Sequence, residues 1–392
     1  MKILVVCQHY YPEPFRVSDM CEGLLKAGHE VFVVTGVPNY PEGKVYADYR
    51  NGKNRDEVIN GVRVHRCFTI ARRNGAIFRF LNYYSFAISS KRYVKKLKEN
   101  FDVVLVNQLS PVMMANAGIA YKKKHGKKLV LYSLDLWPES LVAGGISQKS
   151  FLYRHYKKVS EKIYGQADKI FVTSKMFSDY FAAQFGITDT EYLPQYAEDM
   201  FLPDACKKTP DGNIDLMFAG NVGAVQSVET VIGAARLTQD IKNLRFHIVG
   251  DGSELDNIKK LAEGLKNVFF YGRKPVEEMP KIYSMADAML LTLNDNRVLS
   301  YTLPGKAQAY MAAGKPIIGA IDGEAQTVLS DAKCGFCGKA GDADELADNI
   351  RKFIACENKA ELAENACNYY LKNFAKERFF NRLISVLSDN AK

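Results

Sequence analysis

Two series of short apolar runs constrain the fold of this chain most strongly. Each run holds four or five residues, and stretches with helical periodicity separate the runs. Short, continuously apolar strands that alternate with helices are typical of parallel sheets covered on both faces. The first series is 3–7, 31–35, 103–106, 129–132 and 170–173, and the second is 216–219, 246–249, 268–271, 288–292 and 316–320. The sequence therefore predicts an α/β chain of two doubly wound, Rossmann-like domains.

A break separates the two series. Residues 192–213 hold three prolines and a Pro-Asp-Gly turn signal, with no amphipathic period. Near the end of the chain, residues 373–389 carry phenylalanine, leucine and isoleucine at helical spacing. We therefore expect a first domain over 1–195, joined by a terminal helix over 373–389, and a second domain over 196–372.

The composition excludes several classes of protein. The chain is 47% hydrophobic and 25% charged, which is ordinary for a globular protein and unlike a disordered or collagen-like one. No apolar run reaches the roughly 18 residues of a membrane span, and the apolar start is too short for a signal peptide. The eight cysteines are scattered, as reduced thiols are. These features predict a cytoplasmic protein.

Positive charge is concentrated in the first half of the chain. Residues 1–200 hold 29 Lys and Arg against 19 Asp and Glu, whereas the rest holds 24 against 25. No acidic residue lies between Glu57 and Glu99, and aromatic residues alternate there with ten bases. Such a stretch suits an anionic membrane surface, although a solvated helix and a nucleic-acid contact are alternatives. Because no nucleic-acid motif accompanies it, we expect a membrane or acceptor contact through Arg72, Arg73, Lys95 and Lys96, and no nucleic acid.

Three segments of the second domain suit an anionic ligand. A predicted strand is followed by a turn that contains Gly220, Asn221 and Gly223. A helix then opens with Ser227 as its expected N-cap. Glycines allow close backbone approach, and a helix N-terminus offers free N–H groups to a phosphate. The next strand closes on Gly250 and Asp251, at the edge where open α/β sheets place their ligand.

The third of these segments opens a helix at Pro304 and Lys306. A lysine near a helix start is unfavourable for the helix dipole unless a bound anion compensates it. The alternative is a solvated lysine.

Two polar side chains follow predicted strands of the first domain. Asp135 comes directly after a buried strand, where a carboxylate could bind sugar hydroxyls or move a proton; a turn or helix-cap carboxylate is the alternative. His9 follows the first strand, beside Tyr10 and Tyr11, as a candidate site residue or a structural histidine. Cys334 and Cys337 have no second pair at zinc spacing, and the chain has no P-loop. We therefore expect no metal site and no cofactor.

Taken together, these segments resemble the family-4 glycosyltransferases, which are retaining enzymes of the GT-B fold. The resemblance covers nearly the whole chain. It rests on the motifs at 220–223, 249–255, 270–273, 283–288 and 311–316, and, for the branch that builds bacterial O-antigen, capsule or exopolysaccharide, on those at 38–43 and 135–140.

The resemblance implies two Rossmann-like domains facing a central cleft, and transfer of a sugar from a nucleoside diphosphate donor, a UDP-sugar, to a glycan or lipid-linked acceptor. It implies that the turn at 220–223 and Lys306 hold the diphosphate, that Arg273 lies beside the base, and that Asp135 lies near the transferred sugar. No divalent metal is expected, and the enzyme would act at the inner face of the membrane.

The chain departs from this family at three places. The usual N-terminal glycine-rich loop is replaced by residues 12–16, and Ala224 and Val225 stand where a basic residue often follows the Gly-x-x-Gly turn. Many members carry two glutamates eight positions apart, and Tyr301 and Ala309 stand at those positions here. The alternatives are therefore a GT-B sugar-nucleotide epimerase and a non-catalytic protein that binds a sugar nucleotide.

Overall fold

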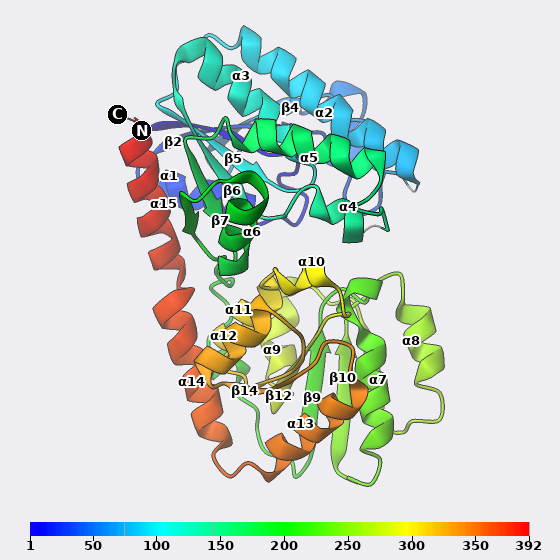
Figure 1. The fold of residues 1–392 in the computed structure, drawn as a ribbon. Coiled ribbons are helices and arrows are strands. Elements are labelled where there is room, and N and C mark those ends of the chain that lie inside the picture. Colours follow the sequence, from blue (N-terminus) through cyan, green and yellow to red (C-terminus); the bar gives the residue numbers. More distant parts are fainter. Residues whose placement is uncertain (74, 144, 392) are drawn as a thin grey trace. The chain divides into compact units, whose positions relative to one another are not determined.

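The computed structural model describes residues 1–73, 75–143 and 145–391 (Figure 1). They form two compact units, each described here by itself. Unit 1 comprises the described residues of 1–173, 177–193 and 380–392, and unit 2 those of 174–176 and 194–379. The chain thus changes unit between Leu193 and Pro194, and 174–176 is a short excursion into unit 2 that no sequence feature indicated.

Unit 1 is built on a sheet of eight strands among its described residues, in the order β3-β4-β2-β1-β5-β6-β7-β8. All neighbours are parallel except β3 and β4. The central strand β1 pairs Val5 with Val33 on one side and with Leu105 on the other, and all three side chains are fully buried. The strands are β1 (Lys2–Val6), β2 (Glu30–Gly36), β3 (Asp56–Ile59), β4 (Val62–Cys67), β5 (Val103–Gln108), β6 (Lys128–Ser133), β7 (Lys169–Val172) and β8 (Thr190–Tyr192).

The helices of unit 1 cover both faces of this sheet. On one face α2, α3 and α5 lie side by side (Figure 1), and a hydrogen bond of 3.1 Å between Tyr84 and Tyr156 joins α2 to α5. On the other face α1 packs against α15, with Gly23 directly under the Phe380 ring. The helices are α1 (Val17–Lys26), α2 (Ala76–Lys96), α3 (Asn116–His125), α4 (Glu139–Ala143), α5 (Phe151–Tyr164) and α6 (Lys175–Phe185).

Unit 2 holds a sheet of six strands among its described residues, all parallel, in the order β11-β10-β9-β12-β13-β14. The strands are β9 (Ile214–Ala219), β10 (Leu244–Val249), β11 (Val268–Gly272), β12 (Ala288–Thr292), β13 (Ile317–Ala320) and β14 (Gly335–Gly338). The helices are α7 (Val228–Leu237), α8 (Leu255–Leu261), α9 (Met279–Tyr283), α10 (Arg297–Ser300), α11 (Gly305–Ala312), α12 (Glu324–Ala332), α13 (Ala343–Ala355) and α14 (Lys359–Asn373). Helices α7 and α13 pack on the sheet with the buried side chains of β9 and β10.

The terminal helix differs from its predicted bounds. The helix α15 runs over Lys376–Ala391, and α14 ends at Asn373, so the chain breaks its helical path around the buried Phe374. The first residues of α15 belong to unit 2 and those from Phe380 onward to unit 1.

All ten predicted strands are confirmed, whereas β3, β4, β8 and β14 were missed. Strand β4 escaped prediction because arginine and histidine interrupt its apolar pattern. Two of the ten bases in the stretch between the glutamates are in fact strand residues. Arg66 is 1% exposed and donates to Glu57 at 2.6 Å, and Arg63 donates to Glu99 at 2.9 Å. The expectation that the whole basic stretch forms one surface is therefore wrong for these two.

The strand orders place the ligand-binding edges. In unit 1 the strands that follow β1 are added first on one side of it and then, from β5 onward, on the other side. In unit 2 the same change of side occurs between β9 and β12. Open parallel sheets bind ligands outside the carboxyl ends of the strands at such a point. Among the described helices, none is long and apolar enough to span a bilayer.

Candidate active site

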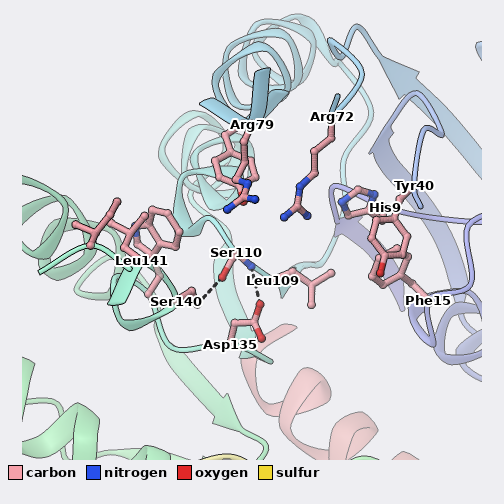
Figure 2. A pocket seen from close by; sticks show the side chains of 13 residues that line it. His9, Phe15, Tyr40, Arg72, Arg79, Leu109, Ser110, Asp135, Ser140 and Leu141 are labelled. Atoms are coloured by element: carbon pink, nitrogen blue, oxygen red, sulfur yellow. Dashed lines mark hydrogen bonds between the residues drawn. The ribbon is translucent and has the colours of Figure 1, made fainter. Parts of the chain in front are cut away.

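A pocket of about 330 Å³ lies at the carboxyl ends of β1, β5 and β6 in unit 1 (Figure 2). Three strand ends supply His9, Ser110 and Asp135 to its lining. The segment before α2 and the first turn of α2 supply Arg72 and Arg79. The predicted residues His9, Asp135 and Arg72 thus share one pocket.

The His9 ring is held from two sides. Its Nδ1 lies 3.0 Å from Oε1 of Glu13, and that buried oxygen also accepts the backbone N–H groups of Asn39 at 2.9 Å and Tyr40 at 2.8 Å. The ring stacks on Phe15 with centroids 4.7 Å apart. A carboxylate at Nδ1 favours the proton on that nitrogen, so that Nε2 of the neutral ring is left as a hydrogen-bond acceptor. Figure 2 shows the ring edge turned toward Arg72.

Asp135 follows β6 and accepts the backbone N–H of Ser110 at 3.0 Å. The Ser110 hydroxyl in turn donates to the Ser140 hydroxyl at 2.7 Å, so the turn after β5 is tied to α4. Burial raises the pKa of Asp135 above its ordinary value, and the Ser110 hydrogen bonds and the Arg72 charge offset only part of this. A carboxyl group of this kind can accept a hydrogen bond or a proton from a ligand hydroxyl.

The neighbouring carboxylate, Glu139, has a structural role. It is 3% exposed and accepts hydrogen bonds from the hydroxyls of Tyr153 and Tyr180, the latter at 2.8 Å. These contacts connect α4, α5 and α6. Of the two carboxylates that follow this strand in sequence, only Asp135 therefore faces the pocket.

The sequence did not indicate Arg79, Phe15, Tyr40 or Tyr83 as pocket residues. Arg79 was counted only as one base of the charged stretch. The aromatic residues come from three separate segments, and only the fold brings them together, so no local pattern could have identified them. The signal available for Arg79 was its position seven residues after Arg72, across a helix start.

The other predicted basic contacts lie outside this pocket. The Arg73 guanidinium lies over the Phe78 ring, 5.5 Å from its centroid. Lys95 lines a separate hollow of about 860 Å³ with Lys91, Lys123, Lys124 and Lys162, and Lys96 is exposed. The four basic residues that sequence analysis grouped therefore divide between the pocket and the surface of α2.

In unit 2, two glycine turns pack backbone against backbone. Gly220 follows β9 and Gly250 follows β10, with φ of +150° and +142°. A side chain on Gly250 would lie 1.8 Å from the Gly220 carbonyl oxygen, and one on Gly252 would lie 2.3 Å from that of Val222. These glycines are thus required by the packing of the turns. The N–H groups of Gly220 and Val222 take part in this packing and donate to the carbonyl groups of Val249 and Asp251, each at 2.9 Å.

Lys306, in the first turn of α11, lies across Gly220. A Cβ on Gly220 would be 3.0 Å from Cδ of Lys306. The ammonium lies 4.0 Å from the centroid of the Phe218 ring and donates to Oε1 of Gln226. No carboxylate lies within ion-pair distance of it in the described part of the chain. Burial lowers the pKa of Lys306 to about 7.

The remaining predicted donor contacts are at the surface around this lysine. Asn221, Asp251 and Arg273 are exposed, and Pro304 is the half-buried residue that begins α11. Arg273 directly follows β11, whose terminal Gly272 carbonyl accepts the Gly250 N–H at 2.9 Å. Ser227 is the N-cap residue of α7, as predicted, but its side chain makes no capping hydrogen bond. The residue has φ +46°, and its hydroxyl bonds to the side chains of Glu229 and Thr230 instead.

No group of three histidine, cysteine or acidic side chains is placed to hold a metal ion within 1–73, 75–143 and 145–391. Cys334 flanks β14 and Cys337 lies on it, and both are free thiols. Unit 1 thus offers two arginines, Arg72 and Arg79, among neutral and acidic side chains, whereas unit 2 offers Lys306 beside a glycine turn.

Comparison with known families identifies both halves of the chain. The model of "Glycosyltransferase Family 4" matches residues 16–194, and that of "Glycosyl transferases group 1" matches residues 205–369. The chain belongs to the family-4 glycosyltransferases of the GT-B fold.

Two relatives of this protein are themselves named as glycosyltransferases, one of them for colanic acid biosynthesis. The "Putative colanic acid biosynthesis glycosyl transferase WcaI" of Escherichia coli is 24% identical over 84% of this chain and 85% of the relative. The "Probable glycosyltransferase WbjE" of Pseudomonas aeruginosa is 28% identical over 56% of this chain, and the match spans 58% of that relative's length. Among solved structures, Anabaena Alr3699/HepE in complex with UDP-glucose matches with a TM-score of 0.70 and 17% identity, covering 99% of this chain and 100% of that one.

Proposed function

We propose that this glycosyltransferase moves a sugar from a UDP-sugar to a glycan or lipid-linked acceptor, with retention of anomeric configuration, in the synthesis of a cell-surface polysaccharide. The single observation that carries the donor half of the proposal is Lys306. Its ammonium lies against a glycine turn, in the first turn of a helix, with no carboxylate to neutralise it among the described residues. A diphosphate is the ligand that such a group fits.

The chemistry asked of the chain is positioning and charge stabilisation. The bond from the anomeric carbon to the diphosphate oxygen breaks, and its electron pair stays on the diphosphate. Lys306 and the N–H groups of Asn221 and Gly223 would stabilise that developing charge, since those of Gly220 and Val222 already donate to backbone carbonyls. The acceptor oxygen forms the new bond to the same face of the sugar, and its proton passes to the departing diphosphate oxygen. In unit 1, Asp135 and His9 are the groups that could orient the acceptor hydroxyl.

The choice of uridine is supported by the structural neighbour that was solved with UDP-glucose, and the choice of pathway by the name of the colanic acid relative. Exposed apolar and basic side chains on α2 support a peripheral position on the cytoplasmic face of an anionic membrane, where a lipid-linked acceptor would be reached. Metal independence and the absence of a cofactor stay predictions.

The test is turnover with a panel of UDP-sugars and a bacterial lipid extract as acceptor. The proposal predicts that free UDP is released from one donor when the extract is present, and that a glycosylated lipid forms. Conversion of the sugar without acceptor, followed by NMR, would instead identify an epimerase. UDP binding with no product of either kind would identify a sugar-nucleotide-binding protein. Either result would overturn the proposal.

A further inference from the structure

Two guanidinium groups point into the pocket of unit 1 (Figure 2). Arg72 and Arg79 have no ion pair with a carboxylate in the described ranges. This distinguishes them from Arg63 and Arg66 of the neighbouring strand, each of which binds a glutamate within 3 Å. The pocket lining contains one carboxylate, that of Asp135, against these two cations. The pocket therefore carries a surplus of positive charge.

The surroundings of the arginines strengthen their attraction for an anion. Tyr83, which is buried, lies 5.9 Å below the Arg72 guanidinium, and Trp137, also buried, packs edge-on against Tyr83. Phe15 and Tyr40 form the opposite wall with His9. Aromatic walls lower the local dielectric constant, so that charge interactions inside the pocket are stronger than at an open surface. Two planar guanidinium forks suit the oxygens of a phosphate group better than the neutral hydroxyls of a sugar.

Exposed apolar side chains cover the outer face of the first turns of α2, the face opposite to that of Arg79. Ile77 is 75% exposed, Phe80 48% and Leu81 40%, at the spacing that puts them on one side of the helix. Phe151, 78% exposed, begins α5, which the Tyr84–Tyr156 hydrogen bond joins to α2. A cluster of this size is unusual on a water-exposed surface and is typical of a contact with lipid or protein. The basic residues that follow on α2 favour an anionic lipid surface.

We propose that this pocket binds the phosphate or diphosphate group that links the acceptor sugar to a lipid, with Arg72 and Arg79 as its ligands. The lipid chain leaves the pocket past the start of α2 and reaches the exposed side chains of Ile77, Phe80 and Leu81 on the outer face of that helix. The inference rests on the proposed function and specifies its acceptor as a lipid-linked glycosyl phosphate. In this arrangement the phosphate lies at the arginines, and the sugar extends toward Asp135 and His9, where its hydroxyl is oriented.

The test measures binding of three probes to the full chain by calorimetry, with UDP present at saturation so that the anion site of unit 2 is occupied. The probes are farnesyl diphosphate, inorganic diphosphate and farnesol. We expect farnesyl diphosphate to bind, and Arg72→Gln and Arg79→Gln each to weaken it by about tenfold or more. Arg92→Gln, which removes an exposed arginine of the same helix outside the pocket, is the matched control and should bind like the unchanged protein.

Each result decides one part of the inference. Farnesyl diphosphate binding that is equal in all variants would overturn the phosphate site. Equal affinity for inorganic and farnesyl diphosphate, both lost in Arg72→Gln, would keep the phosphate site and overturn the lipid part. An unchanged thermal unfolding profile shows that the variants are folded, since UDP affinity reports only on unit 2. Failure of UDP itself to bind the unchanged protein would contradict the proposed function, which separates that failure from failure of the acceptor site.

Discussion

At the scale of single residues, Lys306 distinguishes a ligand site from a structural one. A lysine held away from water usually gains a carboxylate, as Lys208 does with Asp215 at 2.6 Å, or a backbone carbonyl, as the buried Lys315 does with Ala286 at 2.7 Å. Lys306 has only an amide oxygen and an aromatic face, and burial lowers its pKa to about 7. A bound diphosphate would supply the missing negative charge, favour the protonated amine and raise the pKa again.

This predicts that donor binding takes up a proton. Below about pH 7 Lys306 is already charged in the free protein, and above it the amine must be protonated before it can stabilise the diphosphate. Affinity for a UDP-sugar should therefore fall as the pH rises from about 7 to 9, by at most about tenfold per unit. Titration calorimetry in buffers of different ionisation enthalpy measures the uptake directly. Lys306→Gln should bind weakly and without this dependence, whereas Lys260→Gln, an exposed lysine of α8, should behave like the unchanged protein. A pH-independent affinity would contradict the role of Lys306.

Residue-scale prediction from sequence succeeded where position on a strand decided the outcome. His9 and Asp135 were identified because they follow strands, and strand ends converge in a parallel sheet. Arg79 and Tyr40 were missed because their approach to the pocket depends on loop conformations and on helix packing. Glu139 shows where this reasoning fails. It follows the same strand as Asp135, but its carboxylate accepts hydrogen bonds from two tyrosine hydroxyls and does not line the pocket.

At the scale of elements, α2 combines an apolar first half with a basic second half. Its exposed residues Ile77 and Phe80 lie near the pocket, and Lys95 and Lys96 lie at its end. Membrane-surface helices combine these two contributions in the same way. The sequence predicted the basic stretch, but only the structure separates α2 from β4, in which the arginines are paired.

We therefore predict that α2 determines binding to anionic vesicles. Ile77→Ser with Phe80→Ser should weaken sedimentation with phosphatidylglycerol vesicles by about tenfold, because apolar area is no longer buried in the interface. Lys95→Glu with Lys96→Glu should weaken it at low salt, by about 1 kcal/mol per charge removed. The control is the double reversal Lys259→Glu with Lys260→Glu on α8, which carries the same change of charge in unit 2. Equal losses in all three variants, or no loss in the α2 variants, would show that α2 is not the contact.

Another element-scale feature lies at the opposite end of β9 from the glycine turn. Asp215 is 1% exposed and accepts hydrogen bonds from His247 at 2.7 Å and Arg245 at 2.6 Å, and it is paired with Lys208 at 2.6 Å. Burial alone would raise the pKa of Asp215, but these partners outweigh it and hold the pKa well below its ordinary value. This network joins β9 to β10 and to the segment that leads into unit 2.

Asp215→Asn should lower the free energy of unfolding of unit 2 by about 3 kcal/mol, because it leaves the cations around it without their carboxylate. Since the pKa of Asp215 is depressed, its contribution is complete above the unfolded-state value of about 4 and is lost as the pH falls below it. Urea unfolding at neutral pH and below pH 4 measures both effects. Asp240→Asn, which breaks an exposed pair with Arg351, is the matched control and should change the midpoint little. Equal midpoints for the two variants at neutral pH would contradict this account.

At the scale of the whole molecule, the periodicity of the sequence predicted both parallel sheets, and the family comparison confirmed the fold class. Apolar runs determine central strands because these are buried on both faces, so their signal is strong. The edge strands β3, β8 and β14 are short and only partly buried, and no such pattern reveals them. Long-range contacts decide that residues 174–176 belong to unit 2 and that the two parts of α15 belong to different units. Sequence patterns do not show such contacts.

The central claim is that unit 2 binds a nucleoside diphosphate without a metal. The most direct measurement is the thermal unfolding of the full chain with UDP, GDP or ADP, each in the presence of EDTA. We predict that UDP raises Tm by several degrees at about 100 times its Kd, that GDP and ADP do not, and that Lys306→Gln abolishes the shift. No shift with any of the three, or a shift that appears only when magnesium is added, would contradict the claim.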